Sequence, residues 1–411
     1  MTTTKNNEHK KLNFSSEREQ SQACLNSAEH EKNQGRKVLN VPNLRFKEFQ
    51  GEWEESTIGE EFDLYSGNTP SRLNKEHFNG AINWISSGEL KEHYIADTKE
   101  KISDEAAKTL KMLPIETFVI AIYGLEADGV RGTGSITKTE ATISQACMAF
   151  ISKGKVQNEF LYSWYKKHGN VIGIRYAQGT KQQNLSYDII EKFKIAYPTF
   201  QEQEKLNKFI ALLDERIATQ NKIIDKLQSL IKGLRVRLIQ IENGNIVHLG
   251  EIARIYQPQT ISSTELTEDG FLVYGANGII GKYKEYNHKT EQICITCRGN
   301  TCGMVNYTKP MSWITGNAMV INTDEHQNKV CKRYLYHYLS AYNFNSIISG
   351  SGQPQIVRTP LENLEITLPS IFEQEQKAML LDRIQAKIEI SNRVLSLCQE
   401  QKQYLLRQMF I

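Results

Sequence analysis

The feature that most constrains the fold of this chain is an internal duplication. Residues 179–204 align without a gap on residues 350–375, at a constant offset of 171 positions. Eight of the 26 aligned positions are identical, including a Glu-Gln-Glu run at the end of each copy. Self-similarity at a fixed offset takes precedence over any local pattern. It predicts two similar domains in a pseudo-two-fold molecule, which suits a reader of something that also has two halves.

A second set of matches marks where each domain begins. Gly59, Glu60, Tyr65 and Thr69 match Gly250, Glu251, Tyr256 and Thr260 at an offset of 191. The offset therefore falls from 191 to 171 across each domain, so the two interiors differ by 20 residues. Similar ends and divergent interiors predict a common frame that holds two different recognition surfaces.

The interiors contain short apolar runs between Gly and Asn turns, which is typical of strands. We expect strands at 118–123, 146–151, 293–297 and 318–321, and helices at 104–111 and 332–340. The predicted class is α+β: two tandem mixed α/β target-recognition domains separated by an antiparallel two-helix coiled coil.

A long helix is predicted after each Glu-Gln-Glu run, because apolar residues recur there with alternating spacings of three and four. A helix packed only on its own domain would favour a wider stripe of period 3.6. Chain order makes the pair antiparallel, and each helix would be about 55–60 Å long at 1.5 Å per residue. The first seam comprises Ile210, Leu213, Ile217, Ile224, Leu227, Ile231, Leu234 and Leu238, interrupted by Gln220; the second comprises Leu381, Ile384, Ile388, Ser391, Leu395, Cys398, Lys402, Leu405 and Met409.

These patterns divide the chain into five parts. Residues 1–41 form a polar leader with too few apolar residues to offset the entropy of ordering, so disorder is expected there. The remaining parts are a first recognition domain (42–200), a first coiled-coil helix (201–242), a second recognition domain (243–371) and a second helix (372–411).

Composition limits the class of protein more weakly. The 411 residues are 39% apolar and 24% charged, with a formal net charge of +3, which excludes neither nucleic-acid nor protein partners. No run of 18 apolar residues and no secretory signal is present, and seven scattered cysteines favour a reducing compartment. We expect a cytoplasmic protein.

Sequence signatures of catalysis and metal binding are largely missing. Cys294, Cys297 and Cys302 suggest zinc, but the first two lie three apart on an expected strand and would point to opposite faces. No Rossmann or phosphate-binding loop, zinc-protease motif or amino-methyltransferase motif is found. The chain is therefore expected to bind rather than transform its ligand, with no metal and no cofactor of its own.

The candidate DNA-binding residues are polar, aromatic and cationic side chains in glycine-flanked loops. Gln and Asn can form paired hydrogen bonds with adenine, Arg can do so with guanine, and Lys or Ser can hold phosphate. Alternatively, Gln182 and Gln353, which both copies share, satisfy backbone groups of the frame. The candidates are Ser66, Asn68, Arg72, Tyr123, Arg131, Lys138, Lys181, Gln182, Gln183 and Asn184 in the first domain, and Asn277, Lys282, Arg298, Asn300, Gln353 and Gln355 in the second.

Together these features resemble the specificity (S) subunit of type I restriction–modification systems, over about residues 42–411. The resemblance is carried by Tyr197-Pro198 and Leu368-Pro369, each followed by Glu-Gln-Glu and a seam helix, and by the segments 274–278, 314–318 and 350–356. Departures are the leader, Glu204 and Glu375 where the family often has Gln, and the polar second seam.

The resemblance implies a non-catalytic DNA reader of a bacterial defence system. Each recognition domain would bind one half of a bipartite, asymmetric site in double-stranded DNA, and the helices would set the spacing and dock partner subunits. Two methyltransferase (M) subunits would supply S-adenosylmethionine chemistry on adenine N6, and two restriction (R) subunits would add ATP- and Mg-dependent translocation and cleavage.

Two other classes of function stay open on the residues alone. One is a self-contained DNA methyltransferase or nuclease with fused recognition domains, against which the missing cofactor motifs count. The other is a coiled-coil scaffold that binds only protein, against which the divergent interiors count.

Overall fold

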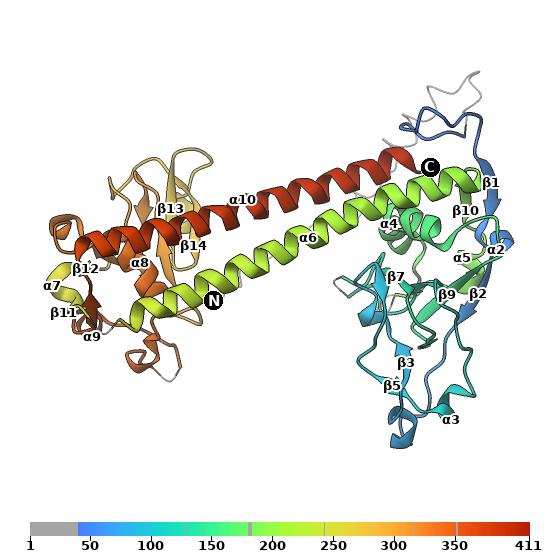
Figure 1. Ribbon diagram of the computed structural model, residues 1–411, viewed down its shortest axis with the longest axis horizontal. Helices are drawn as coiled ribbons and strands as arrows, with labels where there is room; N and C mark the ends of the chain where they lie inside the picture. The colour runs from blue at the N-terminus through green and yellow to red at the C-terminus, as the bar shows by residue number, and fades with distance from the viewer. Residues whose placement is uncertain (1–39, 128, 180–182, 242, 317, 351) are drawn as a thin grey trace, which may run out of the picture. The chain divides into compact units, whose positions relative to one another are not determined.

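Two compact units make up the structure, a computed structural model that describes residues 40–411 except 128, 180–182, 242, 317 and 351 (Figure 1). The first unit contains the described residues up to Ala211 together with Lys402–Ile411, and the second contains Leu212–Gln401. Both mix helices and strands, which confirms the α+β class. The predicted polar leader lies outside the described residues except for its last two positions. No helix in the described part of the chain is long and apolar enough to span a bilayer.

Two sheets and one helix form the interior of the first unit. Their bounds are β2 (Phe62–Ser66), β3 (Ile82–Ile85), β4 (Tyr94–Ile95), β5 (Lys101–Ile102), β6 (Phe118–Ala121), β7 (Gly134–Thr137), β8 (Thr142–Ile143), β9 (Cys147–Ser152) and α4 (Asn158–Tyr176). The larger sheet has the order β2-β9-β6-β7-β4, with only the β4–β7 pair parallel. In the smaller sheet, β3 pairs antiparallel with β5 and parallel with β8. Helix α4 packs on β6, β7 and β9, whose apolar residues form the core.

The second unit repeats this connectivity. Its elements are β12 (Arg254–Tyr256), β13 (Phe271–Gly275), β14 (Gly278–Tyr283), β15 (Ile293–Thr296), β16 (Val305–Tyr307), β17 (Trp313–Ile314), β18 (Ala318–Asn322) and α8 (Lys332–Ala341). The antiparallel order β12-β18-β15-β16 corresponds to β2-β9-β6-β7, and β14-β13-β17 corresponds to β5-β3-β8 in order and direction. The two interiors therefore share a topology that their sequences do not reveal.

The frame expected from the duplication is a two-stranded ribbon in each unit. Strand β1 (Glu54–Thr57) pairs with β10 (Lys194–Tyr197), and β11 (Asn245–His248) pairs with β19 (Glu365–Leu368). A Cβ placed at Gly59 would lie 3.1 Å from the Cβ of Glu191, and one at Gly250 would lie 3.2 Å from that of Glu362. These glycines and glutamates recur in both copies because each pair is in contact.

The short helices are α2 (Ile58–Glu61), α3 (Asp104–Ala107), α5 (Tyr187–Ile190), α7 (Leu249–Ile252) and α9 (Arg358–Glu362), with 3-10 turns η1 (Lys75–Phe78), η2 (Ser87–Glu89), η3 (Ser263–Glu265), η4 (Asp324–His326) and η5 (Phe344–Ser346).

A buried glutamine attaches each long helix to its recognition domain. Gln203 near the start of α6 (Phe200–Ile239) donates to the carbonyls of Pro198 and Lys155 and accepts from the Gln157 N–H. Gln374 near the start of α10 (Ile371–Met409) makes the same three contacts, with Pro369, Lys329 and Cys331. Both side chains are at most 1% exposed. The Glu-Gln-Glu run is thus duplicated because its glutamine is a structural clamp.

Within the second unit, α6 and α10 pair along the predicted seam and run antiparallel (Figure 1). Gln220 bonds to Ser391, while Ile231 and Leu238, further along α6, share an apolar cluster with Ala378 and Leu381, further back along α10. Every predicted seam position on both helices is buried or half-buried. The predicted heptad register and antiparallel direction are therefore confirmed here.

Within the first unit, the start of α6 and the end of α10 pack on the recognition domain. Leu206, Ile210, Leu405 and Met409 are buried, and the Phe410 ring lies 5.2 Å from that of Phe160 on α4. Segment 40–53 is fastened to α6 by Arg45, which bonds to both carboxylate oxygens of the buried Glu202 at 2.8 and 2.7 Å.

Two local expectations were inaccurate. The helix expected at 104–111 ends at Ala107, because the following residues form a turn. The 19-residue helix α4 was not predicted, although its first turns contain the buried aromatic run Phe160, Tyr162 and Trp164. Apolar residues occupy most positions there, so the run lacks the clear amphipathic period on which a helix prediction depends.

Candidate nucleic-acid interface

Two loops of the first unit meet to form a polar surface. The backbone of Asn184 forms bridges with Tyr123 and Gln178, and the Leu185 N–H donates to Ile122 O at 2.9 Å. Arg131 Nη2 donates to Gln183 Oε1 at 2.9 Å. The structure thus brings together four predicted candidates, Tyr123, Arg131, Gln183 and Asn184, from segments about 60 residues apart.

Part of the hydrogen-bonding capacity of this surface is unused. Arg131 Nε and Asn184 Oδ1 are buried and have no partner among the described residues. The Gln183 N–H donates to Glu126 at 2.7 Å, and this bond lowers the pKa of the Glu126 carboxyl. The Tyr123 side chain is 40% exposed, so a ring is available for stacking beside donors and acceptors. Such a set suits the edges of nucleobases.

The second unit forms the same junction with different side chains. Gln355 forms backbone bridges with Arg298 and Ser349, and the Ile356 N–H donates to Cys297 O at 3.0 Å. Gln355 lies 171 positions after Asn184, so the two residues are repeat equivalents with equivalent bridges. The duplication therefore places one loop against one strand end in both domains.

Further candidates lie beside this second junction. Asn277, in the turn between β13 and β14, accepts a hydrogen bond of 2.5 Å from Thr301, which joins that turn to the loop carrying Arg298 and Asn300. Arg298, Asn300, Asn277 and Gln353 are exposed. A guanidinium and three amides thus occupy adjoining loops, and this is a donor–acceptor set that can distinguish base pairs in the major groove.

Most of the remaining candidates bond to residues outside the two loop junctions, and two lie outside the described residues. Arg72 is held by both oxygens of Glu100 at 2.8 Å, Lys138 lies 3.7 Å above the Tyr94 ring, and Lys282 pairs with Asp269 at 3.6 Å. Asn68 caps its own loop through Thr69 and holds the Trp84 indole, and Ser66 is exposed at the end of β2. Lys181 and Gln182 lie outside the described residues. The structure does not join the described residues among these to the two loop junctions.

Cys294, Cys297 and Cys302 are not grouped as a metal-ligand set. Cys294 and Cys297 belong to different apolar clusters, as expected for opposite faces of β15 and its continuation. Burial raises the pKa of the Cys294 thiol well above its usual range. In the part of the chain that is described, no three His, Cys, Asp or Glu side chains are grouped as metal ligands.

The seam residues are less suitable for subunit docking than the sequence suggested. Ile210, Leu213, Ile224, Ile231, Leu381, Ile388 and Leu405 are at most 9% exposed, so they are occupied by the helix pair itself. Other apolar residues of the two helices are open to a partner, among them Ile223 and Leu230 on α6 and Met379, Ile390 and Leu397 on α10, which are 38–59% exposed. Ile390 and Leu397 lie seven residues apart, and that spacing is the signal that sequence analysis overlooked.

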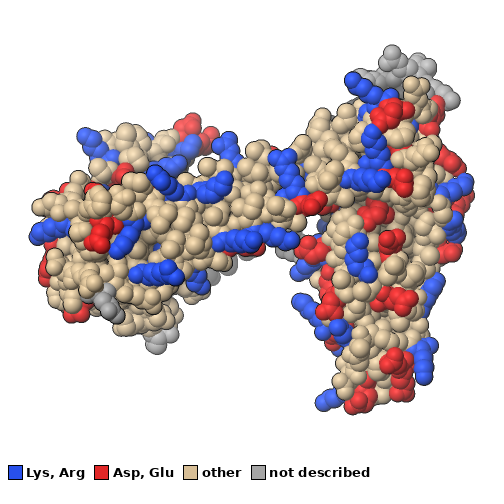
Figure 2. Space-filling view, viewed as in Figure 1, with Lys and Arg blue, Asp and Glu red and all other residues tan. Residues whose placement is uncertain are grey.

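Charge is distributed unevenly on the face seen in Figure 2. Lys and Arg are more frequent than Asp and Glu over the second unit, whereas both signs are mixed over the first. On this face the second unit therefore presents more basic than acidic side chains, although the net charge of the whole chain is small.

Comparison with known proteins agrees with these observations. The model of the type I restriction modification DNA specificity domain matches residues 50–229 and again residues 242–397. The chain is 25% identical over 356 residues to the EcoprrI specificity subunit of Escherichia coli, covering 78% of this chain and 85% of that protein.

Solved structures with this fold cover nearly the whole chain. The S subunit of a type I restriction–modification system from M. genitalium superposes with a TM-score of 0.64 at 17% identity, covering 90% of this chain and 99% of that one. A chain from a structure of complex assembly and conformational transition in a type I R-M system gives a TM-score of 0.54 at 15% identity, covering 87% and 97%. The chain belongs to the type I restriction–modification specificity family and is a specificity subunit with two tandem recognition domains.

Proposed function

We propose that each recognition domain reads one half of a bipartite, asymmetric site in double-stranded DNA through its loop junction. The observation that supports this most directly is the equivalence of Asn184 and Gln355: identical backbone bridges carry different side chains. One scaffold with two side-chain sets is what two different half-sites require. Tyr123, Arg131, Gln183 and Asn184 would contact one half, and Asn277, Arg298, Asn300 and Gln355 the other.

The antiparallel helix pair would set the distance between the half-sites and dock the partners. Joined readers gain affinity only when their separation matches the spacing of their targets. The exposed apolar residues Met379, Ile390 and Leu397, together with Ile223 and Leu230, would be covered by two methyltransferase subunits. Those subunits would supply S-adenosylmethionine for adenine methylation, and restriction subunits would supply ATP- and Mg-dependent cleavage.

In this account the chain itself is non-catalytic. Its sequence carries no cofactor-binding loop or amino-methyltransferase motif, and its loop junctions contain amide, guanidinium and aromatic groups rather than an acid–base or nucleophilic pair. Calorimetry with S-adenosylmethionine should show no binding to the isolated chain and binding after methyltransferase subunits are added. Binding to the isolated chain would favour a self-contained enzyme.

A salt titration separates a DNA reader from a protein scaffold. The complex with its methyltransferase subunits should bind a duplex carrying the recognised site with an affinity that falls linearly with salt on a double-logarithmic plot. A duplex with one half-site scrambled should bind more weakly. Equal affinity for both duplexes at every salt concentration would contradict the proposal.

The helix pair can be tested as a spacer by lengthening it. Seven residues inserted after Gln220 and seven after Ser391 preserve the heptad and add about 10 Å, equivalent to about three base pairs. We expect methylation at the original spacing to be lost and a longer spacing to be selected from a library. An unchanged preferred spacing would show that the helices do not measure the distance.

A further inference from the structure

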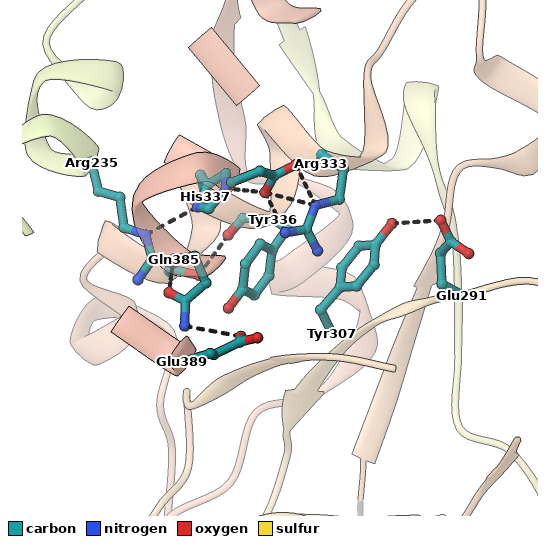
Figure 3. A network of polar contacts seen from close by, with 10 residues as sticks. Arg235, Glu291, Tyr307, Arg333, Tyr336, His337, Gln385 and Glu389 are labelled. Carbon is teal, nitrogen blue, oxygen red and sulfur yellow. Dashed lines mark hydrogen bonds and ion pairs between the residues drawn. The ribbon is translucent and has the colours of Figure 1, made fainter. Parts of the chain in front are cut away.

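Four charged and polar side chains of the second unit form a continuous hydrogen-bonded network (Figure 3). Arg333 Nε lies 2.9 Å from both carboxylate oxygens of Asp382, and its Nη2 contacts the same carboxylate. His337 Nε2 lies 2.8 Å from Asp382 Oδ1, and Arg235 Nε donates to His337 Nδ1 at 3.1 Å. The network joins three helices, α6 through Arg235, α8 through Arg333 and His337, and α10 through Asp382.

The directions of these bonds fix the protonation of His337. Because Arg235 can only donate, Nδ1 must accept, and the ring proton of the neutral imidazole lies on Nε2 and points to Asp382. The His337 side chain is fully buried, and burial lowers its pKa, which favours this neutral form. Burial would raise the pKa of Asp382, but the bonds from His337 and Arg333 hold it at about 2. The carboxylate is therefore charged and fully engaged.

The network also reaches the recognition sheet. The Arg333 guanidinium lies 4.2 Å above the ring of Tyr307 at the end of β16, and 5.2 Å above that of Tyr336. A cleft of about 400 Å³ opens beside these residues, lined by Tyr307, Arg333, Tyr336, Gln385 and Glu389. Apolar packing is thus incomplete on this side of α10, and the polar contacts span the gap between sheet and helix.

The first repeat cannot form this network. Aligning Phe160–Trp164 with Tyr334–Tyr338 places Glu159 and Ser163 at the positions of Arg333 and His337, and the helix offset of 171 places Ala211 at the position of Asp382. Glu159 instead bonds to His93 at 2.8 Å. The second domain therefore has, besides the clamp glutamine that both domains share, a directional network that the first domain lacks. A forked Arg–carboxylate pair restricts angle as well as distance.

We propose that Arg235, Arg333, His337 and Asp382 act as an orientation lock, holding the second recognition domain at one angle to the helices and thereby restricting the spacer lengths that the complex accepts. They are positioning residues, because they act through the domain rather than on DNA. The inference rests on the proposed function and adds a determinant of spacing separate from helix length.

The test measures methylation of a DNA library in which both half-sites are fixed and the spacer is the native length, one base pair shorter or one longer. The full chain is assembled with its methyltransferase subunits. Asp382→Asn should raise the ratio of methylation at off-length to native-length spacers by about tenfold, because the charge-assisted bonds from Arg333 to the carboxylate are lost. Arg333→Lys keeps the positive charge but loses the two-pronged guanidinium contact with the carboxylate, so it should also raise the ratio above that of the wild type.

Two further variants keep the test decisive. Arg235→Met removes the outer bonds to His337 and Gln385 while retaining an apolar stem over Tyr336, so it should fold and raise the ratio less. Glu400→Gln makes the same change of charge at an exposed position of α10 that bonds to Ser396 and not to the network, so it should leave the ratio unchanged.

Each alternative outcome has a distinct meaning. A uniform fall in methylation at every spacer length would mean that the network only supports folding, which would contradict the proposal. An unchanged ratio in both Asp382→Asn and Arg235→Met would also contradict it. A change in half-site bases would assign these residues to base reading and also overturn it. If the wild-type complex selected no bipartite site at all, the proposed function would fail, and the lock, which rests on it, would fail with it.

Discussion

The side-chain amide of Gln220 lies 3.3 Å from the backbone carbonyl of Ser391, to which it donates a hydrogen bond. The two residues are 171 positions apart, which is the offset of the duplication. Equivalent positions of the two repeats therefore face each other in the helix pair, and both are polar residues in largely apolar seams. The relationship places the centre of the antiparallel pairing at these two residues.

Replacing Gln220 with Leu should stabilise the helix pair. The substitution removes a polar side chain from a largely apolar seam. The Ser391 carbonyl loses one hydrogen bond but keeps the one it makes within its own helix. We expect the free energy of unfolding to rise by about 1 kcal/mol in a urea titration. Gln228→Leu, on the exposed face of α6, is the matched control and should change it by less than about 0.5 kcal/mol. A clear loss of stability in Gln220→Leu would show that the polar pair is needed for the pairing.

Removing the buried clamp Gln374 should be costly. Gln374→Ala leaves the Cys331 N–H and the carbonyls of Lys329 and Pro369 without their partner, at about 2–3 kcal/mol of unfolding free energy. Gln376→Ala, exposed two residues later, should change stability by less than about 0.5 kcal/mol. Similar losses in the two variants would argue against a clamp.

Arg298→Ala should alter only one half of the recognised site. Loss of a guanidinium that pairs with guanine removes about 1–3 kcal/mol of discrimination at one base position and leaves the other half intact. Methylome sequencing of cells carrying the variant would show a relaxed position in one half-site. Lys284→Ala, an exposed control in the same unit, should weaken methylation without relaxing any position. Relaxation in both halves would contradict separate readers.

Acid should destabilise the first unit through His168. Burial lowers the pKa of His168 to about 4, and the ring bonds to the Ile411 carbonyl at 2.9 Å. Because the folded pKa lies below the unfolded value of about 6.5, the unfolded chain binds the proton first. This contribution to stability is complete above about pH 6.5 and is lost as the pH falls toward 4. The stability difference between wild type and His168→Gln, measured from pH 7.5 to 4.5, should shrink; a constant difference would exclude His168 as its source.

Local, repeated features of the fold could be predicted from the sequence. Apolar residues recur at a regular spacing from Ile210 to Leu238, and a second seam follows at a fixed offset. Periodicity therefore predicts the register of the pairing, and chain order predicts its direction. Strand β15 was likewise expected from a run of β-branched residues. These predictions depend on neighbours in the chain rather than on distant contacts.

The candidate site was less predictable because it depends on non-local pairing. Arg72 and Arg131 looked alike as loop cations, yet one is held by Glu100 and the other lies beside Gln183. The network around His337 joins residues from three helices, Arg235 and Asp382 being 147 positions apart. No local pattern signals either arrangement. The duplicated Gln203 and Gln374 were visible, but only their burial shows why they recur.

The most direct test of the central claim is a domain exchange. Residues 57–200 would be replaced with the corresponding segment of another family member, and the methylome of cells carrying the hybrid and its methyltransferase subunits would be sequenced. The account predicts a bipartite motif in which one half changes to that of the donor while the other half is kept. A motif changed in both halves, or in neither, would contradict two independent readers on one chain.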